Sequence, residues 1–237
     1  MKISHIAAIF VATLLMSGCG GRKADDKPRA DYSLSLGDSI EVMRTEIDSC
    51  NSAIASLKES QDIWLRDFTT IDNSREAAPY IIYSAFRDKY PPVTTSVMAR
   101  LADNGQFEIV AALAGARFSS ITVTAPDVSA SSETVPPDQA LNYMAGNLNT
   151  VLFTGPKADS IGRLISNNEL NNISVTFVNN GPVKSWSIPD SYKKMLSATF
   201  RLYDAQRQIN TLERRVPMLN KKINILREHL EKNNPKP

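Results

Sequence analysis

The sequence predicts an α+β fold: a long antiparallel two-helix coiled coil, made of an N-terminal and a C-terminal helix, with an inserted small, mostly antiparallel β-rich head domain. Three observations predict it. Apolar residues follow heptad spacing in two segments, these two segments carry opposite charge, and the segment between them is rich in β-branched residues and turn signals. The 237 residues, 42% of them hydrophobic, are enough to bury a core. A formal net charge of +2 argues against a nucleic-acid partner.

Residues 1–18 are predicted to be a signal peptide. Lys2 supplies the positive start, and the apolar run from Ile6 to Met16 is shorter than the roughly 20 residues that a membrane-spanning helix needs. Cys19 follows Met16-Ser17-Gly18, which resembles the lipobox of bacterial lipoproteins, although Met16 stands where leucine is usual. The resemblance implies that the Cys19 sulfur carries a lipid such as palmitate. A plain secreted protein is the alternative.

Residues 19–37 are predicted to form the lipid-bearing cysteine and a flexible, polar tether. Gly20 follows Cys19, and by resemblance to the lipoprotein sorting rule this residue implies the outer membrane. The periplasmic face and the cell surface both stay open. Cys50 then has no partner for a disulfide, and we expect it to be a small core residue.

Residues 38–73 are predicted to be the N-terminal coiled-coil helix, with Asp38 as its N-cap. Its apolar seam, interrupted once by a glutamine, contains Ile40, Met43, Ile47, Cys50, Ile54, Leu57, Gln61, Trp64, Phe68 and Ile71. Trp64 is therefore expected to pack in the seam rather than to bind a ligand.

Residues 193–231 are predicted to be the C-terminal coiled-coil helix, and residues 232–237 a disordered tail. The seam of this helix contains Met195, Ala198, Leu202, Ala205, Ile209, Leu212, Val216, Leu219, Ile223, Leu226 and Leu230.

Charge indicates that the two helices pair within one chain. Residues 38–73 contain eight acidic and three basic residues, whereas residues 201–237 contain nine basic and four acidic ones. The antiparallel register places Lys58 opposite Glu213 and Glu46 opposite Lys222. A monomeric hairpin is favoured over a parallel dimer of the C-terminal helix, which stays the alternative.

Residues 74–192 are predicted to form the head, with five to seven strands. Asp103-Asn104-Gly105 and Asn179-Asn180-Gly181 are hairpin signals. Short helices are expected around residues 137–144 and from Asp159 to Ile165.

A family resemblance rests on the segments VMARLADNGQFEIVAALAG, VLFTGPKADSIGRLISNN and NISVTFVNNG, the last of which precedes the long final helix. With the lipobox, these segments resemble a group of Bacteroidetes-type lipoproteins that has no assigned activity. The resemblance implies architecture and envelope location only. The Asp-Ser-Ile sequences at Ser39 and Ser160 also resemble O-glycosylation sites of these bacteria, and helix capping explains both equally well.

No catalytic, cofactor-binding or metal-binding residue is assigned. Of the two histidines, His5 lies in the signal peptide and His229 is expected to be solvated. Trp186, on a predicted strand, is the candidate ligand contact, although a half-buried packing role is the alternative.

The sequence therefore predicts a non-enzymatic cell-envelope lipoprotein that acts as an interaction or scaffold module. Its expected partners are the membrane, through the lipid on Cys19, and an envelope protein. A surface glycan-binding protein or a glycan-acting hydrolase, with a glycan as the ligand, is the alternative.

Overall fold

The computed structural model describes residues 29–72 and 78–233. In this part of the chain, two long helices flank a region of ten strands, a shorter helix and a 3-10 helix. The helices are α1 (Arg29–Leu65), η1 (Ser84–Lys89), α2 (Gly155–Asn167) and α3 (Asp190–Asn233). The strands are β1 (Phe68–Ile71), β2 (Tyr80–Tyr83), β3 (Ser96–Ala102), β4 (Phe107–Ala114), β5 (Ser120–Ala125), β6 (Val128–Ser131), β7 (Asn142–Ala145), β8 (Leu148–Phe153), β9 (Ser174–Val178) and β10 (Pro182–Ser187).

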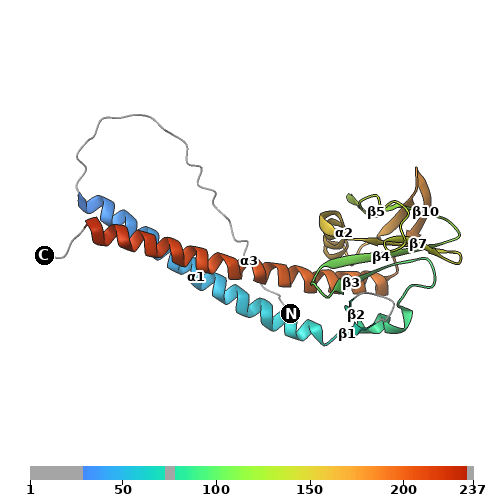
Figure 1. Ribbon diagram of the computed structural model, residues 1–237, viewed down its shortest axis with the longest axis horizontal. Helices are drawn as coiled ribbons and strands as arrows, with labels where there is room; N and C mark the ends of the chain where they lie inside the picture. The colour runs from blue at the N-terminus through green and yellow to red at the C-terminus, as the bar shows by residue number, and fades with distance from the viewer. Residues whose placement is uncertain (1–28, 73–77, 234–237) are drawn as a thin grey trace.

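The strands form two antiparallel sheets. The larger has six strands in the order β1-β2-β3-β4-β8-β7, and the smaller has four in the order β10-β9-β5-β6. α2 and the first part of α3 lie against this β-rich region, whereas the rest of α3 and nearly all of α1 extend away from it (Figure 1).

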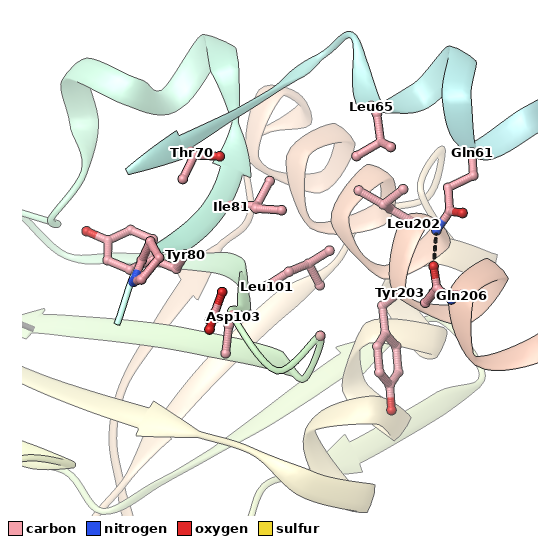
Figure 2. Close-up of a pocket in the computed structure, with 13 residues that line it drawn as sticks. Gln61, Leu65, Thr70, Tyr80, Ile81, Leu101, Asp103, Leu202, Tyr203 and Gln206 are labelled. Atoms are coloured by element: carbon pink, nitrogen blue, oxygen red, sulfur yellow. Dashed lines mark hydrogen bonds between the residues drawn. The ribbon is translucent and has the colours of Figure 1, made fainter. Parts of the chain in front are cut away.

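α1 and the outer part of α3 lie side by side and run in opposite directions (Figure 1). The predicted ion pair between Lys58 and Glu213 is present at 2.8 Å. Glu46, however, pairs with Arg215 rather than with Lys222. Where α1 approaches the strands, the side-chain amide of Gln61 donates to the amide oxygen of Gln206 at 2.8 Å (Figure 2). The two ion pairs, Lys58–Glu213 and Glu46–Arg215, are exposed, and exposed ion pairs contribute well under about 1 kcal/mol each.

The predicted fold class, a long coiled-coil pair that carries a small separate head, is wrong. α1 ends at Leu65, and Phe68–Ile71, predicted as helix, forms strand β1, so strands follow the N-terminal helix directly. α1 also begins at Arg29, inside the predicted tether. Of the predicted seam residues before Gln61, Ile40 and Cys50 are buried and the others only half-buried. The β-rich region is larger than predicted, since ten strands are described rather than five to seven.

The physical reason lies in the first turns of α3. Leu196, Ser197, Thr199 and Phe200 are buried together with the predicted seam residue Met195, so most of the helix circumference is buried here, and only the face of Lys194, Ala198 and Arg201 is open. A helix that is buried over most of its circumference belongs to a domain core rather than to a two-helix coiled coil, which buries a single stripe. Heptad spacing identifies one apolar stripe, and does not reveal that the residues flanking it are buried as well.

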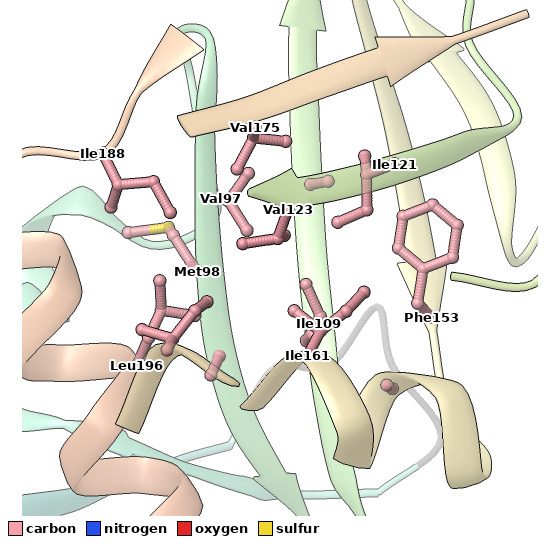
Figure 3. Packing of buried hydrophobic residues seen from close by; sticks show 14 of the residues in the cluster. Val97, Met98, Ile109, Ile121, Val123, Phe153, Ile161, Val175, Ile188 and Leu196 are labelled. Atoms are coloured by element: carbon pink, nitrogen blue, oxygen red, sulfur yellow. The ribbon is translucent and has the colours of Figure 1, made fainter. Parts of the chain in front are cut away.

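The hydrophobic core lies between the two sheets and the helices. Ile109 of β4, Ile121 and Val123 of β5, and Val175 of β9 are fully buried, and the strands that carry them run across one another (Figure 3). Ile161 of α2 closes the core from the helical side. Burial of each large apolar side chain contributes roughly 1.5–3 kcal/mol, so this core is the main source of stability in the β-rich region.

Both predicted hairpins are confirmed. β3 pairs with β4 across Gly105, whose φ is 77°, and β9 pairs with β10 across Asn180, whose φ is 55°. Glycine and asparagine tolerate this left-handed backbone region, which hairpin turns require. The helix predicted at residues 137–144 is wrong, because Asn142–Ala145 forms strand β7.

The predicted N-caps Asp38 and Asp159 are also wrong, because both lie inside helices. The neighbouring serines Ser39 and Ser160 donate through Oγ to the main-chain carbonyls of Ser35 and Pro156, at 2.8 and 2.9 Å. Each hydroxyl therefore has a hydrogen-bond partner in the preceding turn of its own helix, and glycosylation of either serine remains a prediction.

Gly162 allows α2 to approach β4 and α3 closely. A Cβ atom at this position would lie 2.4 Å from Phe200 and 2.8 Å from Phe107. We expect Gly162→Ala to lower the free energy of unfolding by about 1–3 kcal/mol, because overpacking outweighs the better helix propensity of alanine. Urea titration measures the change. Gly37→Ala is the control, since Gly37 lies in α1 with nothing within 4 Å. A Gly162→Ala protein as stable as the unmodified chain would contradict this packing.

Candidate functional site

A first cavity, the junction cavity, lies where the end of α1 meets β2, β3 and α3. Its volume is about 320 Å³, and it is lined by Gln61, Leu65, Thr70, Pro79, Tyr80, Ile81, Leu101, Ala102, Asp103, Gly105, Leu202, Tyr203 and Gln206. Leu65, Ile81, Leu101 and Leu202 supply apolar surface from four different elements (Figure 2). An apolar wall with a few polar groups at its edge is typical of a site that accepts an apolar group.

The polar chemistry of the junction cavity is limited. The Tyr203 hydroxyl donates to the carboxylate of Asp159 on α2 at 2.8 Å. Burial, followed by the hydrogen bond with Asp159 and its charge, raises the pKa of Tyr203, so the phenol stays protonated at neutral pH. Asp103 is the one carboxylate among the lining residues. The cavity walls therefore offer shape and apolar surface rather than an acid and a base.

A second site, which we call the Trp64 cleft, consists of two cavities of about 340 and 250 Å³ that share Trp64 and Arg201. The first is also lined by Leu57, Arg163, Ser166, Asn167, Phe200, Asp204, Ala205 and Gln208. The second is also lined by Asp67, Phe68, Tyr83, Glu169, Lys194 and Ala198. The cleft thus brings together the end of α1, the end of α2, the loop that follows α2, and α3.

Charges of both signs line the Trp64 cleft. Arg201 forms an ion pair with Glu169, and Arg163 lies 3.8 Å from Asp204. The remaining charged lining residues are Lys194 and Asp67, so three basic residues face three acidic ones. The separation of Arg163 from Asp204 exceeds hydrogen-bond length, and a guanidinium has five N–H donors. The cleft therefore has little net charge and retains capacity to donate and accept hydrogen bonds.

A buried lysine fixes the loop that carries Glu169. The side chain of Lys193 is 5% exposed, and its Nζ donates to the main-chain carbonyl of Asn171 at 2.7 Å. Lys193 also forms an ion pair with Asp190, at 2.8 Å. Because a buried ammonium needs its partners, these contacts hold the loop after α2 against the start of α3.

Trp186, the ligand contact predicted from sequence, lines none of these three cavities. It is half-buried on β10, and its ring packs edge-on against Tyr192, with 5.4 Å between ring centroids. Tyr192 in turn packs against Phe86 at 4.8 Å. Trp186 therefore belongs to an aromatic cluster between β10, α3 and η1.

The other residues considered in the sequence are the two cysteines and the two histidines. Cys19 lies outside the described residues, as does His5. Cys50 is buried and His229 is exposed, as expected. Among the residues that the structure describes, no group of three or more His, Cys, Asp or Glu side chains is arranged to hold a metal ion.

Trp64 is the residue that sequence reasoning missed. It packs against the hydrophobic core, in line with the predicted packing role, but it is only half-buried and also lines both parts of the cleft, which the sequence did not predict. The missed signal is local: α1 ends one residue later, at Leu65, so no further helical turn covers this side chain.

Comparison with protein-family models, curated proteins and solved structures gives no match for this chain. Among the helices described, none combines the length and the apolar character needed to cross a membrane.

The raised pKa of Tyr203 predicts a pH-dependent stability. Below about pH 9 the phenol is protonated in both states. Above its ordinary pKa of 10.0 the unfolded chain ionises first, so the folded state holds more protons and the free energy of unfolding falls. We expect Tyr203→Phe to weaken this fall between about pH 9 and 11, as measured by thermal denaturation. Tyr143→Phe, at a 40% exposed position, is the control. An unchanged pH dependence in Tyr203→Phe would contradict the assignment.

Proposed function

We propose that this chain is a non-enzymatic cell-envelope lipoprotein that acts as an interaction or scaffold module. In this proposal the Cys19 sulfur carries the lipid, and the β-rich region is the part of a monomeric chain that meets a partner protein. The junction cavity, with its apolar wall, supports contact with an apolar side chain of that partner.

The observation that carries the proposal is the position of the start of α1. Together with the end of α3, it lies at the end of the molecule farthest from the β-rich region (Figure 1). Arg29 follows Cys19 by ten positions, a distance that an extended chain spans in at most about 36 Å. A helix of 37 residues is about 55 Å long, so a lipid on Cys19 would leave the β-rich region well away from the membrane.

Two features support the non-enzymatic part of the proposal. The junction cavity has a single carboxylate, whereas hydrolysis of a glycan by the usual mechanism needs two. The Trp64 cleft has three carboxylates, but two of them, Glu169 and Asp204, lie in ion pairs with arginines. The phenol that lines this cavity has a raised pKa and therefore remains a hydrogen-bond donor rather than a base.

The chain contains two cysteines, which gives a matched test of anchoring. We expect Cys19→Ala to abolish palmitate labelling and to move the protein from the membrane fraction to the soluble fraction, because stable anchoring requires the acyl chains. Cys50→Ala is the control, and this variant should remain labelled and membrane-bound.

Separation of the inner and outer membranes by density then tests which membrane carries the protein. The unmodified protein is expected with the outer membrane. A Cys19→Ala protein that stays labelled and membrane-bound would overturn the proposal.

A further inference from the structure

The Trp64 cleft has the composition of a ligand site, and its chemistry restricts the ligand. One part, of about 340 Å³, falls near the lower end of the range of roughly 300–1,000 Å³ that small-molecule sites occupy, and the other, of about 250 Å³, lies just below it. Trp64 lies at the boundary shared by both parts, so a ligand that fills either one contacts the indole.

The charged groups exclude two classes of ligand. Asp67, Glu169 and Asp204 would repel a phosphate or another strongly anionic group, since three basic residues only balance them. A wholly apolar ligand would remove these ions from water without giving them hydrogen bonds, which is unfavourable. A fitting ligand is therefore neutral and polar, with an apolar surface for Trp64.

A sugar ring meets these requirements. Its C–H face packs on an indole, and each hydroxyl both donates and accepts a hydrogen bond. The cleft offers hydrogen-bond acceptors in Glu169 and Asp204 and donors in Arg163 and Arg201. The side-chain amides of Asn167 and Gln208 each contain both a donor and an acceptor. Carboxylate and guanidinium groups form the stronger, charge-assisted hydrogen bonds.

We infer that the Trp64 cleft binds a neutral carbohydrate through stacking on Trp64 and hydrogen bonds from the surrounding charged pairs. The inference goes beyond the envelope function proposed above. It does not depend on the lipid at Cys19, and either proposal can fail without the other. The competing ligand is a peptide, because Leu170, next to Glu169, is 98% exposed and could contact an apolar side chain.

The two tryptophans of the chain, Trp64 and Trp186, allow a direct test. In full-length Trp186→Phe protein, purified in detergent, Trp64 is the only indole. Its fluorescence is followed during titration with maltohexaose, cellohexaose, xylohexaose and N-acetylchitohexaose. We expect at least one of them to change the emission saturably, with half-saturation below about 1 mM. The Trp64→Phe protein, in which Trp186 is the reporter, should give no response while retaining its circular dichroism spectrum.

A second pair of variants tests the polar contacts. In the Trp186→Phe protein, Glu169→Ala is expected to weaken binding at least tenfold. Glu133→Ala is the matched control, because Glu133 also forms an ion pair with a basic residue, Lys157 at 3.1 Å, but lines neither part of the cleft. The Glu133→Ala variant should bind the oligosaccharide with unchanged affinity.

Three results would overturn the inference. The first is no response of Trp64 to any of the four oligosaccharides at 10 mM. The second is a saturable response in the Trp64→Phe protein, which would place the site at Trp186. The third is a saturable response to a tryptic digest of casein in the absence of any response to the sugars, which would make the cleft a peptide site.

Discussion

The structure depends on the burial of the first turns of α3 within the β-rich region. Met195, Leu196 and Phe200 belong to the same core cluster as Ile109 of β4 and Ile161 of α2. Gly162 makes this possible, since α2 can approach Phe200 only where no Cβ intervenes. Because α3 continues as one helix to Asn233, the core of the β-rich region sets the direction of the outer helix, and α1 packs along that helix.

Both candidate sites follow from this arrangement, because the same turns of α3 line them. Leu202, Tyr203 and Gln206 face the junction cavity, whereas Arg201 and Asp204 face the Trp64 cleft. The end of α1 supplies the opposite wall in each case. The position of one helix therefore determines whether both sites exist, and the buried Lys193 adds the loop that completes the cleft.

Turn signals in the sequence predicted the hairpins correctly, whereas the capping signals at Asp38 and Asp159 did not mark the starts of helices. The hairpins at Gly105 and Asn180 were predictable because a positive φ restricts the choice of residue at the turn itself. The architecture was not predictable in the same way. Pairing of β4 with β8 joins segments far apart in the chain, and the heptad pattern in α3 does not distinguish a helix that packs on strands from one that packs on another helix. The cleft position of Trp64 was not predicted because the sequence does not show that α1 ends at Leu65. Trp186 was chosen as the candidate because its packing against Tyr192 is a tertiary contact that the strand sequence does not reveal.

Amide hydrogen exchange along α3 tests the central claim most directly. If the first turns of α3 belong to the core, the amides of Leu196–Ala205 open only with global unfolding and exchange as slowly as those of Ile109–Leu113 in β4. The amides of residues 209–230, in the outer part of α3 that lies beside α1 and away from the strands (Figure 1), should exchange faster. Equal and rapid exchange along the whole helix would contradict the account, because α3 would then be an arm attached to the β-rich region rather than part of its core.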